Sequence, residues 1–134
     1  MEANPGSVLF MANNTPLTNF SGNTLTGGTY IVNGATGQGG YLQLDLGANG
    51  GGEILDNAAG IVLNGPTGYT FFEDPFGHNA LTNLAANITA QSSFTVTGGY
   101  DFQTVGDFSN AGTVHVGGAG SALIIGPGGI SSYT

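Results

Sequence analysis

The densest group of side chains able to do chemistry lies in residues 71–79, where Glu73, Asp74 and His78 fall within six residues. Two carboxylates beside an imidazole could seed a metal site, and an oxygen-rich set of this kind would favour calcium. Glu73 and Asp74 are adjacent, however, so they cannot easily face one ion. The Pro75-Phe76-Gly77 run is typical of a turn. We therefore expect a solvated loop and no cofactor, with calcium at these three residues as the alternative.

A second set of acids could form the carboxylate pair of a glycoside hydrolase, which needs two groups about 5–10 Å apart. The candidates are Asp101 and Asp107, or Asp56 from an adjacent coil as one member of the pair. With eight acids in the chain some pair will always lie close, and no sequence resembles a nucleophile elbow or a catalytic triad. We expect these acids to keep exposed strands and turns solvated, and the protein to be no enzyme.

The charge composition excludes whole classes of partner. The 134 residues include no Lys or Arg, eight Asp or Glu and two His, which gives a formal charge of −8. Without cationic side chains the chain cannot neutralise nucleic-acid phosphates or bind anionic lipid surfaces. It has no Cys, which excludes disulfides and thiolate metal sites. Its apolar runs are only a few residues long, so we expect no membrane insertion.

Short segments of alternating apolar and polar residues predict strands with one buried face. The clearest are residues 41–46, 93–97 and 113–116, and nearly every run is bounded by Gly, Asn or Pro. The side chains expected to point into the core are Leu42, Leu44, Leu46, Phe94, Val96, Val114 and Val116.

A repeat organises these strands. Residues 55–57, 81–83 and 108–110 each read apolar-x-Asn and are followed by an apolar run. The copies are spaced by 26 and 27 residues, and repeats of this length with several short strands are typical of solenoids. We expect Leu55, Leu81 and Phe108 to point inward, and Asn57, Asn83 and Asn110 to stack about 4.8 Å apart as a hydrogen-bonded ladder.

The sequence thus predicts an all-β protein, a parallel β-helix of about five coils. Residues 1–134 would form one solenoid domain, with residues 1–16 as an N-terminal arm or cap. A β-sandwich is the second possibility, because short strands separated by Gly-rich turns also build sandwiches.

The last copy of the repeat resembles a known family. Residues 108–116 (Phe-Ser-Asn-Ala-Gly-Thr-Val-His-Val), followed by Gly-Ser-Ala-Leu-Ile at 120–124, are similar to repeats of bacterial autotransporter passenger domains and filamentous-haemagglutinin-like adhesins. Coils of that family commonly read apolar-x-Asn-x-Gly-Thr-apolar-x-apolar and then Gly-Ser-x-Leu. The match spans residues 55–125, about half the chain, and the middle copy lacks the Gly. The resemblance implies an extracellular, bacterial cell-surface location and a structural or adhesive role.

Such a solenoid has open strand edges at its ends, and open edges are templates for further strand pairing. Apolar runs lie near both termini, at Val8, Leu9 and Phe10 and at Leu123, Ile124 and Ile125. We therefore expect a non-enzymatic structural or adhesive module that joins end to end with copies of itself or with flanking repeats.

Two other functions fit the same fold. The first is an ice-binding solenoid, which would use rows of Thr such as Thr24 with Thr26 and Thr95 with Thr97. The second is a β-helix that binds or degrades a polysaccharide, so a carbohydrate partner stays open.

Overall fold

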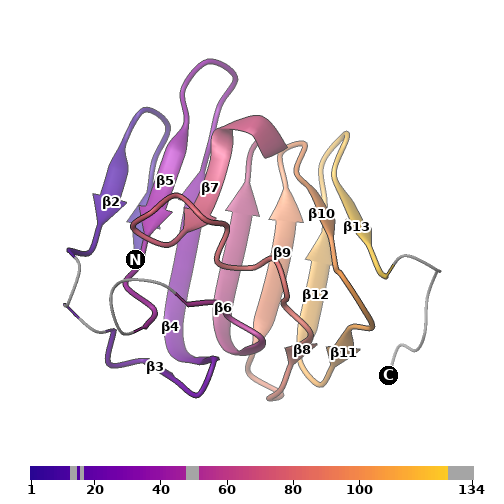
Figure 1. Ribbon diagram of the computed structural model, residues 1–134. Helices are drawn as coiled ribbons and strands as arrows, with labels where there is room; N and C mark the ends of the chain where they lie inside the picture. Colours follow the sequence, from indigo (N-terminus) through magenta and orange to yellow (C-terminus); the bar gives the residue numbers. More distant parts are fainter. Residues whose placement is uncertain (13–14, 16, 48–51, 127–134) are drawn as a thin grey trace.

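The computed structural model describes residues 1–12, 15, 17–47 and 52–126, and these form short strands joined by turns and irregular segments. Strands make up 47% of the structure, which confirms the all-β prediction. The strands form three sheets (Figure 1). Residues 80–91 contain a turn and a short strand.

The largest sheet contains the long central strands. Its members are β1 (Glu2–Ala3), β3 (Phe20–Ser21), β4 (Thr24–Asn33), β6 (Asp56–Asn64), β8 (Ala86–Asn87), β9 (Ser93–Thr97), β11 (Ser109–Asn110) and β12 (Thr113–Val116). The second sheet is β2 (Val8–Phe10), β5 (Gly40–Gln43) and β7 (Thr70–Glu73), and the third is β10 (Asp101–Gln103) with β13 (Ala122–Ile124). A single 3-10 turn, η2 (Thr67–Tyr69), precedes β7.

The strands pair in parallel, which a β-sandwich of antiparallel sheets would not do. In the described part of the chain, β3–β4 is the one antiparallel strand pair. The order β1-β4-β6-β9-β12 follows the sequence, and the chain passes through β2, β5, β7, β10 and β13 in between. Each pass therefore lays one strand beside the strand from the previous pass (Figure 1).

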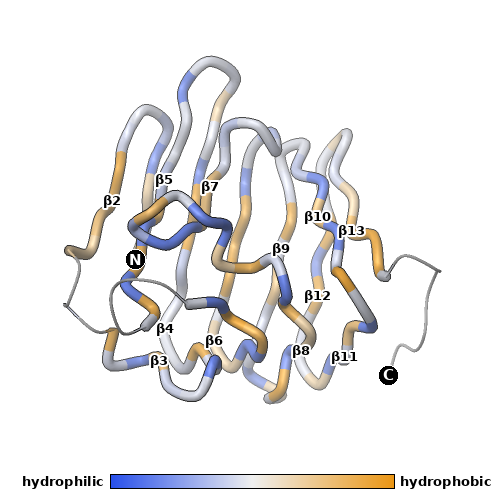
Figure 2. Tube along the Cα trace, viewed as in Figure 1, coloured by the Kyte–Doolittle hydropathy of each residue, from blue (hydrophilic) through white to orange (hydrophobic). Residues whose placement is uncertain are grey.

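Buried residues alternate with half-buried ones along β6 and β9, and the buried side chains form the hydrophobic core. Hydrophobic and hydrophilic residues accordingly follow one another along the chain trace (Figure 2). Of the residues predicted for the core, seven are buried: Leu42, Leu44, Leu46, Leu81, Phe94, Val96 and Phe108.

Three core predictions need correction. Leu55 is only half-buried, and the fully buried side chain at this place is Ile54. Val114 is half-buried against the core, and Val116 is 42% exposed. Both valines lie on β12, which among the described strands has a neighbour, β9, on one side only. No described strand therefore covers their side chains on the other side.

The N-terminal segment, predicted as an arm or cap, contributes a strand to each of two sheets. Glu2 and Ala3 pair with Ile31 and Val32, and Val8 pairs with Tyr41. Residues 13, 14 and 16 lie outside the described part of the chain.

A ladder of buried Asn side chains is present, but one predicted member is wrong. Asn57 Nδ2 donates to Asn87 Oδ1 (2.8 Å), and Asn87 Nδ2 donates to Asn110 Oδ1 (2.9 Å). Asn83 lies in an exposed turn, where it donates to the Glu53 carboxylate. The register β6–β8–β11 puts Asn87 between the other two, so the spacings are 30 and 23 residues.

This ladder also satisfies backbone groups. Asn57 Oδ1 accepts the N–H of Ala59 (2.9 Å), and its Nδ2 also donates to the carbonyl of Ser93 (3.0 Å). Asn57 and Asn87 are 0% and 1% exposed, so each amide replaces water as the partner of neighbouring groups.

A second corner of the fold is built from Asn and Gly. Asn64 Nδ2 donates to Asn33 Oδ1 (2.8 Å), and each Asn is followed by a Gly whose backbone packs on the next pass. A Cβ added to Gly65, whose φ is +134°, would lie 2.2 Å from the carbonyl oxygen of Gly34. This corner therefore admits no side chain at Gly65.

Replacing Asn87 by Ala should lower the free energy of unfolding by about 2 kcal/mol, because the buried Asn57 amide loses one of its hydrogen-bond partners. Urea denaturation at constant m-value measures this change. The matched control is Asn83→Ala, which removes an exposed Asn and should change stability by less than about 0.5 kcal/mol. Equal losses for the two variants would contradict the corrected ladder.

Gly65→Ala should destabilise the protein by at least about 2 kcal/mol, because the new Cβ meets the Gly34 carbonyl and the backbone conformation disfavours it. Gly68→Ala is the control, since a Cβ there meets nothing within 4 Å. The midpoint of thermal unfolding, followed by circular dichroism, compares the two. A Gly65→Ala midpoint equal to that of Gly68→Ala would rule out the close approach.

Candidate functional site

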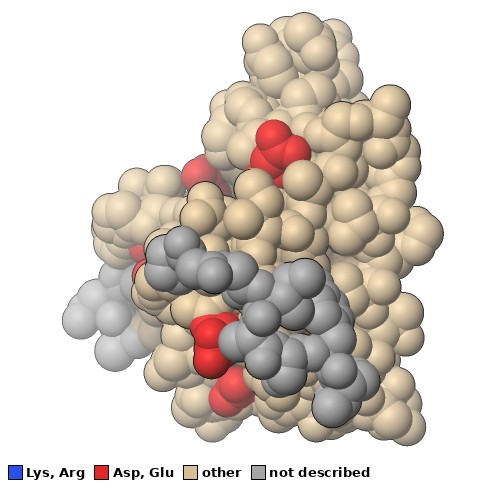
Figure 3. Space-filling model, turned by 90° about the vertical axis from the view of Figure 1, so that its right-hand side faces the viewer, with Lys and Arg blue, Asp and Glu red and all other residues tan. Residues whose placement is uncertain are grey.

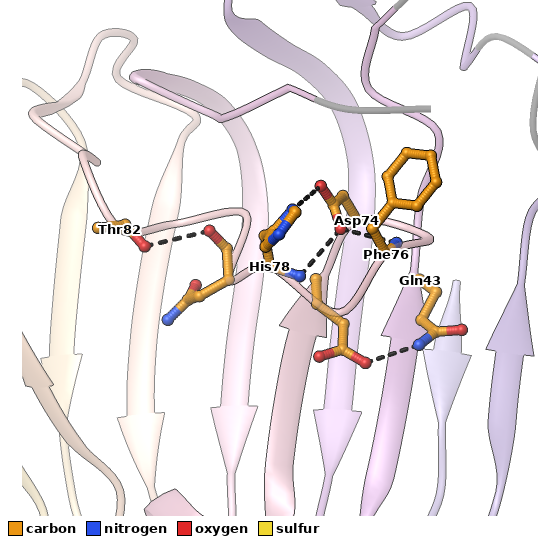
Figure 4. Close-up of polar contacts among 7 residues, drawn as sticks. Gln43, Asp74, Phe76, His78 and Thr82 are labelled. Carbon is orange, nitrogen blue, oxygen red and sulfur yellow. Dashed lines mark hydrogen bonds and ion pairs between the residues drawn. The ribbon is translucent and has the colours of Figure 1, made fainter. Parts of the chain in front are cut away.

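The turn after β7 is organised by the carboxylate of Asp74. Asp74 Oδ1 accepts the backbone N–H groups of Phe76 (2.8 Å) and His78 (2.9 Å), and Oδ2 lies 2.9 Å from His78 Nδ1 (Figure 4). The chain then reverses, and Asn79 forms an antiparallel bridge with Glu73. Asp74 is 2% exposed, so this carboxylate is committed to holding the turn.

Burial works to raise the pKa of the Asp74 carboxyl. The hydrogen bonds donated by His78, through its backbone and its side chain, and by the Phe76 N–H outweigh that effect. The net result is a pKa below the usual value for Asp. Asp74 therefore stabilises the fold in its charged form.

Glu73 is used differently, because adjacent residues at the end of a strand point to opposite sides. Its Oε1 accepts the Nε2 of Gln43 on the neighbouring strand at 2.6 Å (Figure 4). Glu73, Asp74 and His78 do not converge: the described residues contain no cluster of three or more His, Asp or Glu that could hold a metal ion.

The site best suited to bind a ligand lies where the second sheet stops. β7 pairs with β5, but β10 pairs with β13, and none of the described strand pairs joins β7 to β10. The Asp101 N–H donates instead to Thr67 Oγ1 (2.8 Å). A pocket of about 280 Å³ occupies this break, lined by Thr67, Thr70, Phe71, Phe72, Glu73, Gly77, Asn79 and Tyr100.

Phe71, Phe72 and Tyr100 are the aromatic residues of the pocket lining. Phe71 stacks on a further aromatic ring. On its β5 side the ring is covered by Tyr41, with centroids 4.5 Å apart and an angle of 11° between the ring planes. Tyr100 is 6% exposed, and burial raises the pKa of its phenol, which therefore stays protonated as a hydrogen-bond donor. The sequence contains these residues, but their separation along the chain gave no sign that they share a pocket.

The carboxylates considered for hydrolysis lie on different elements. Asp56 lies on β6 opposite Thr24 and Ala86, whereas Asp101 lies on β10 in another sheet. Asp107 is exposed in the connection between β10 and β11.

The Thr pairs considered for ice binding do not align with each other. Thr24 and Thr26 lie opposite Asp56 and Ala58, whereas Thr95 lies opposite Val62. Over the described strands these positions do not form a regular row of Thr.

The residues predicted for self-association lie at the two ends of the stack. Val8, Leu9 and Phe10 are 58%, 38% and 51% exposed, on a strand whose described partner, β5, covers one edge. At the other end Ile124 is 46% exposed and Leu123 is half-buried. Ile125 is buried instead, at 6% exposure, because it follows β13 into the core.

Comparison of the chain with protein-family models, with curated proteins and with solved structures found no match. Within the described ranges no helix has the length and apolar character that crossing a membrane requires.

Asp74→Asn should cost about 2 kcal/mol of stability at pH 7, because the Phe76 and His78 N–H groups then donate to a neutral acceptor and the acceptor facing His78 Nδ1 becomes a donor. The pKa of Asp74 is lower in the folded state than in the unfolded chain. Its contribution is therefore complete above the unfolded pKa, near 3.9, and is lost as the pH falls through the folded value.

Denaturation of the wild type and of Asp74→Asn from pH 7 down to about pH 2 should thus show the difference between their free energies of unfolding shrinking in acid. Asp107→Asn, which alters an exposed acid, serves as the control and should track the wild type. A gap that stays constant over this range would contradict the assignment.

Proposed function

We propose that the chain is a parallel β-solenoid of about five coils that serves as a non-enzymatic structural or adhesive module, joined end to end by strand pairing. The main support is that the described edge strands at both ends are paired on one side only. In the described part of the chain β1 and β2 have partners on one side only, and so do β12 and β13. Unpaired edges of this kind are templates for another chain.

The two ends are complementary in direction. Because the strands between them pair in parallel, β12 and β13 of one copy can pair in parallel with β1 and β2 of the next. Such a contact is heterologous, and heterologous contacts that do not close a ring build filaments.

The ends also have suitable surfaces. Where described residues are visible on the end that carries β12 and β13, most are neither acidic nor basic and a few are Asp or Glu (Figure 3). Exposed apolar side chains lie on the edge strands at both ends, at Val8, Phe10, Val116 and Ile124. Backbone pairing with apolar contacts needs no cation, which suits a chain that has no Lys or Arg.

The location follows from the resemblance of residues 108–116 to bacterial surface repeats. We propose an extracellular, bacterial cell-surface setting, in which the partner is another copy or a flanking repeat.

A proline substitution at the N-terminal edge tests the proposal. Ser7 O accepts from the Tyr41 N–H and the Met11 N–H donates to Gln43 O, so by alternation the Phe10 N–H faces the open side. Phe10→Pro should therefore remove an edge donor without breaking a bond to β5.

In sedimentation velocity the wild type should form larger species as concentration rises, and Phe10→Pro should stay monomeric with an unchanged circular dichroism spectrum. Phe76→Ser is the matched control, because it removes an equally exposed Phe (57%) from the turn after β7 and should leave association intact. A wild type that stays monomeric at millimolar concentration would overturn end-to-end joining.

A further inference from the structure

The residues that line the pocket between β7 and β10 take no part in the proposed end-to-end joining. We propose that it binds one pyranose ring of a neutral sugar, stacked on Phe71 and hydrogen-bonded to Glu73 and Asn79. The proposal is independent of end-to-end joining, because none of these residues belongs to the terminal strands.

The aromatic platform is available because the sheet stops. Outward residues on β2, β5 and β7 form a column in which Val8 pairs with Tyr41 and Tyr41 with Phe71. Tyr41 covers the face of Phe71 on the β5 side. On the side where β10 would supply the next member, Phe71 borders the pocket. The apolar C–H face of a sugar ring is a suitable neighbour for that aromatic surface.

Polar groups of both kinds surround this platform. The Glu73 carboxylate, 7% exposed, is a strong acceptor held in place by Gln43. Asn79 Oδ1 accepts the N–H of Leu81 (2.8 Å), which leaves Nδ2 as the donor of that amide. Thr67 Oγ1 accepts from the Asp101 N–H, so its own proton can be donated. Sugar hydroxyls both donate and accept, and this set satisfies both needs.

Charge selects among ligands. The pocket contains Glu73 and adjoins Asp74 and Asp101, and the whole chain has no Lys or Arg. A phosphate or a uronic acid would meet repulsion without a compensating cation. Calcium takes six to eight oxygen ligands, and Glu73 is the one carboxylate in the pocket lining. A neutral polyol is the ligand that fits.

Size limits the ligand to one ring. Pockets for drug-sized molecules span about 300–1,000 Å³, and this one measures about 280 Å³. We therefore expect millimolar affinity, with stronger binding only where several copies present the pocket together.

Titration of ¹⁵N-labelled full-length protein tests the proposal. Glucose, galactose, mannose and N-acetylglucosamine are added separately, with galacturonate, glycerol and calcium chloride as comparisons. At least one neutral sugar should shift the backbone amide signals of Gly77, Asn79 and Asp101 saturably. Galacturonate and glycerol should bind at least tenfold more weakly.

Two variants assign the shifts to the platform. Phe71→Leu keeps apolar volume but removes the ring, and should weaken binding about tenfold. Phe76→Leu makes the same change on an exposed ring outside the pocket lining and should leave binding unchanged. Because the wild-type titration alone decides whether sugar binds, a misfolded Phe71→Leu would not rescue the proposal.

Three results would overturn it. One is the absence of saturable shifts at these amides with any of the four sugars up to about 100 mM. Another is calcium shifting them in place of sugar, which would make the pocket a cation site. The third is equal loss of affinity in Phe71→Leu and Phe76→Leu. None of these bears on filament formation, which sedimentation measures separately.

Discussion

The stacking of parallel strands in one register is the constraint on which the rest of this structure depends. Because each pass of the chain repeats the position of the previous one, side chains of one kind gather into columns. Inside lie leucines and phenylalanines; buried amides form the ladder of Asn57, Asn87 and Asn110; outside, Tyr41 stacks on Phe71. These columns need no ion pair, which explains how a chain without Lys or Arg is held together.

Local pattern predicted two of the three clearest strands, because alternation with a period of two is a property of the segment itself. The alternating run 41–46 forms a strand only as far as Gln43, since β5 is Gly40–Gln43. β9 and β12 begin and end where the alternating runs 93–97 and 113–116 do. Register could not be predicted in the same way, because it depends on how many residues each turn consumes. Residues 81–83 match the apolar-x-Asn pattern but lie in a turn. The Asn that pairs with Asn57 is Asn87, four residues after Asn83.

The candidate site could not be predicted from the sequence for a related reason. Glu73 and Asp74 are neighbours in sequence, and only the structure separates a carboxylate beside Gln43 from one that holds a turn. The pocket depends on a sheet that stops after β7, which no local pattern records. The second corner did have a signal: an Asn-Gly pair occurs at 33–34 and again at 64–65, where the side chains bond.

The break in the second sheet between β7 and β10 also affects how the structure would carry a mechanical load. Two ladders, β4–β6 and β5–β7, join the second and third passes of the chain along the stacking direction. Between the third and fourth passes the described strand pairs belong to the large sheet alone, as β6–β9 and β6–β8. Tension applied along the stack therefore passes through one ladder system at that level. On the side of the second sheet the Asp101 N–H to Thr67 Oγ1 hydrogen bond takes the place of a described strand pair at that level.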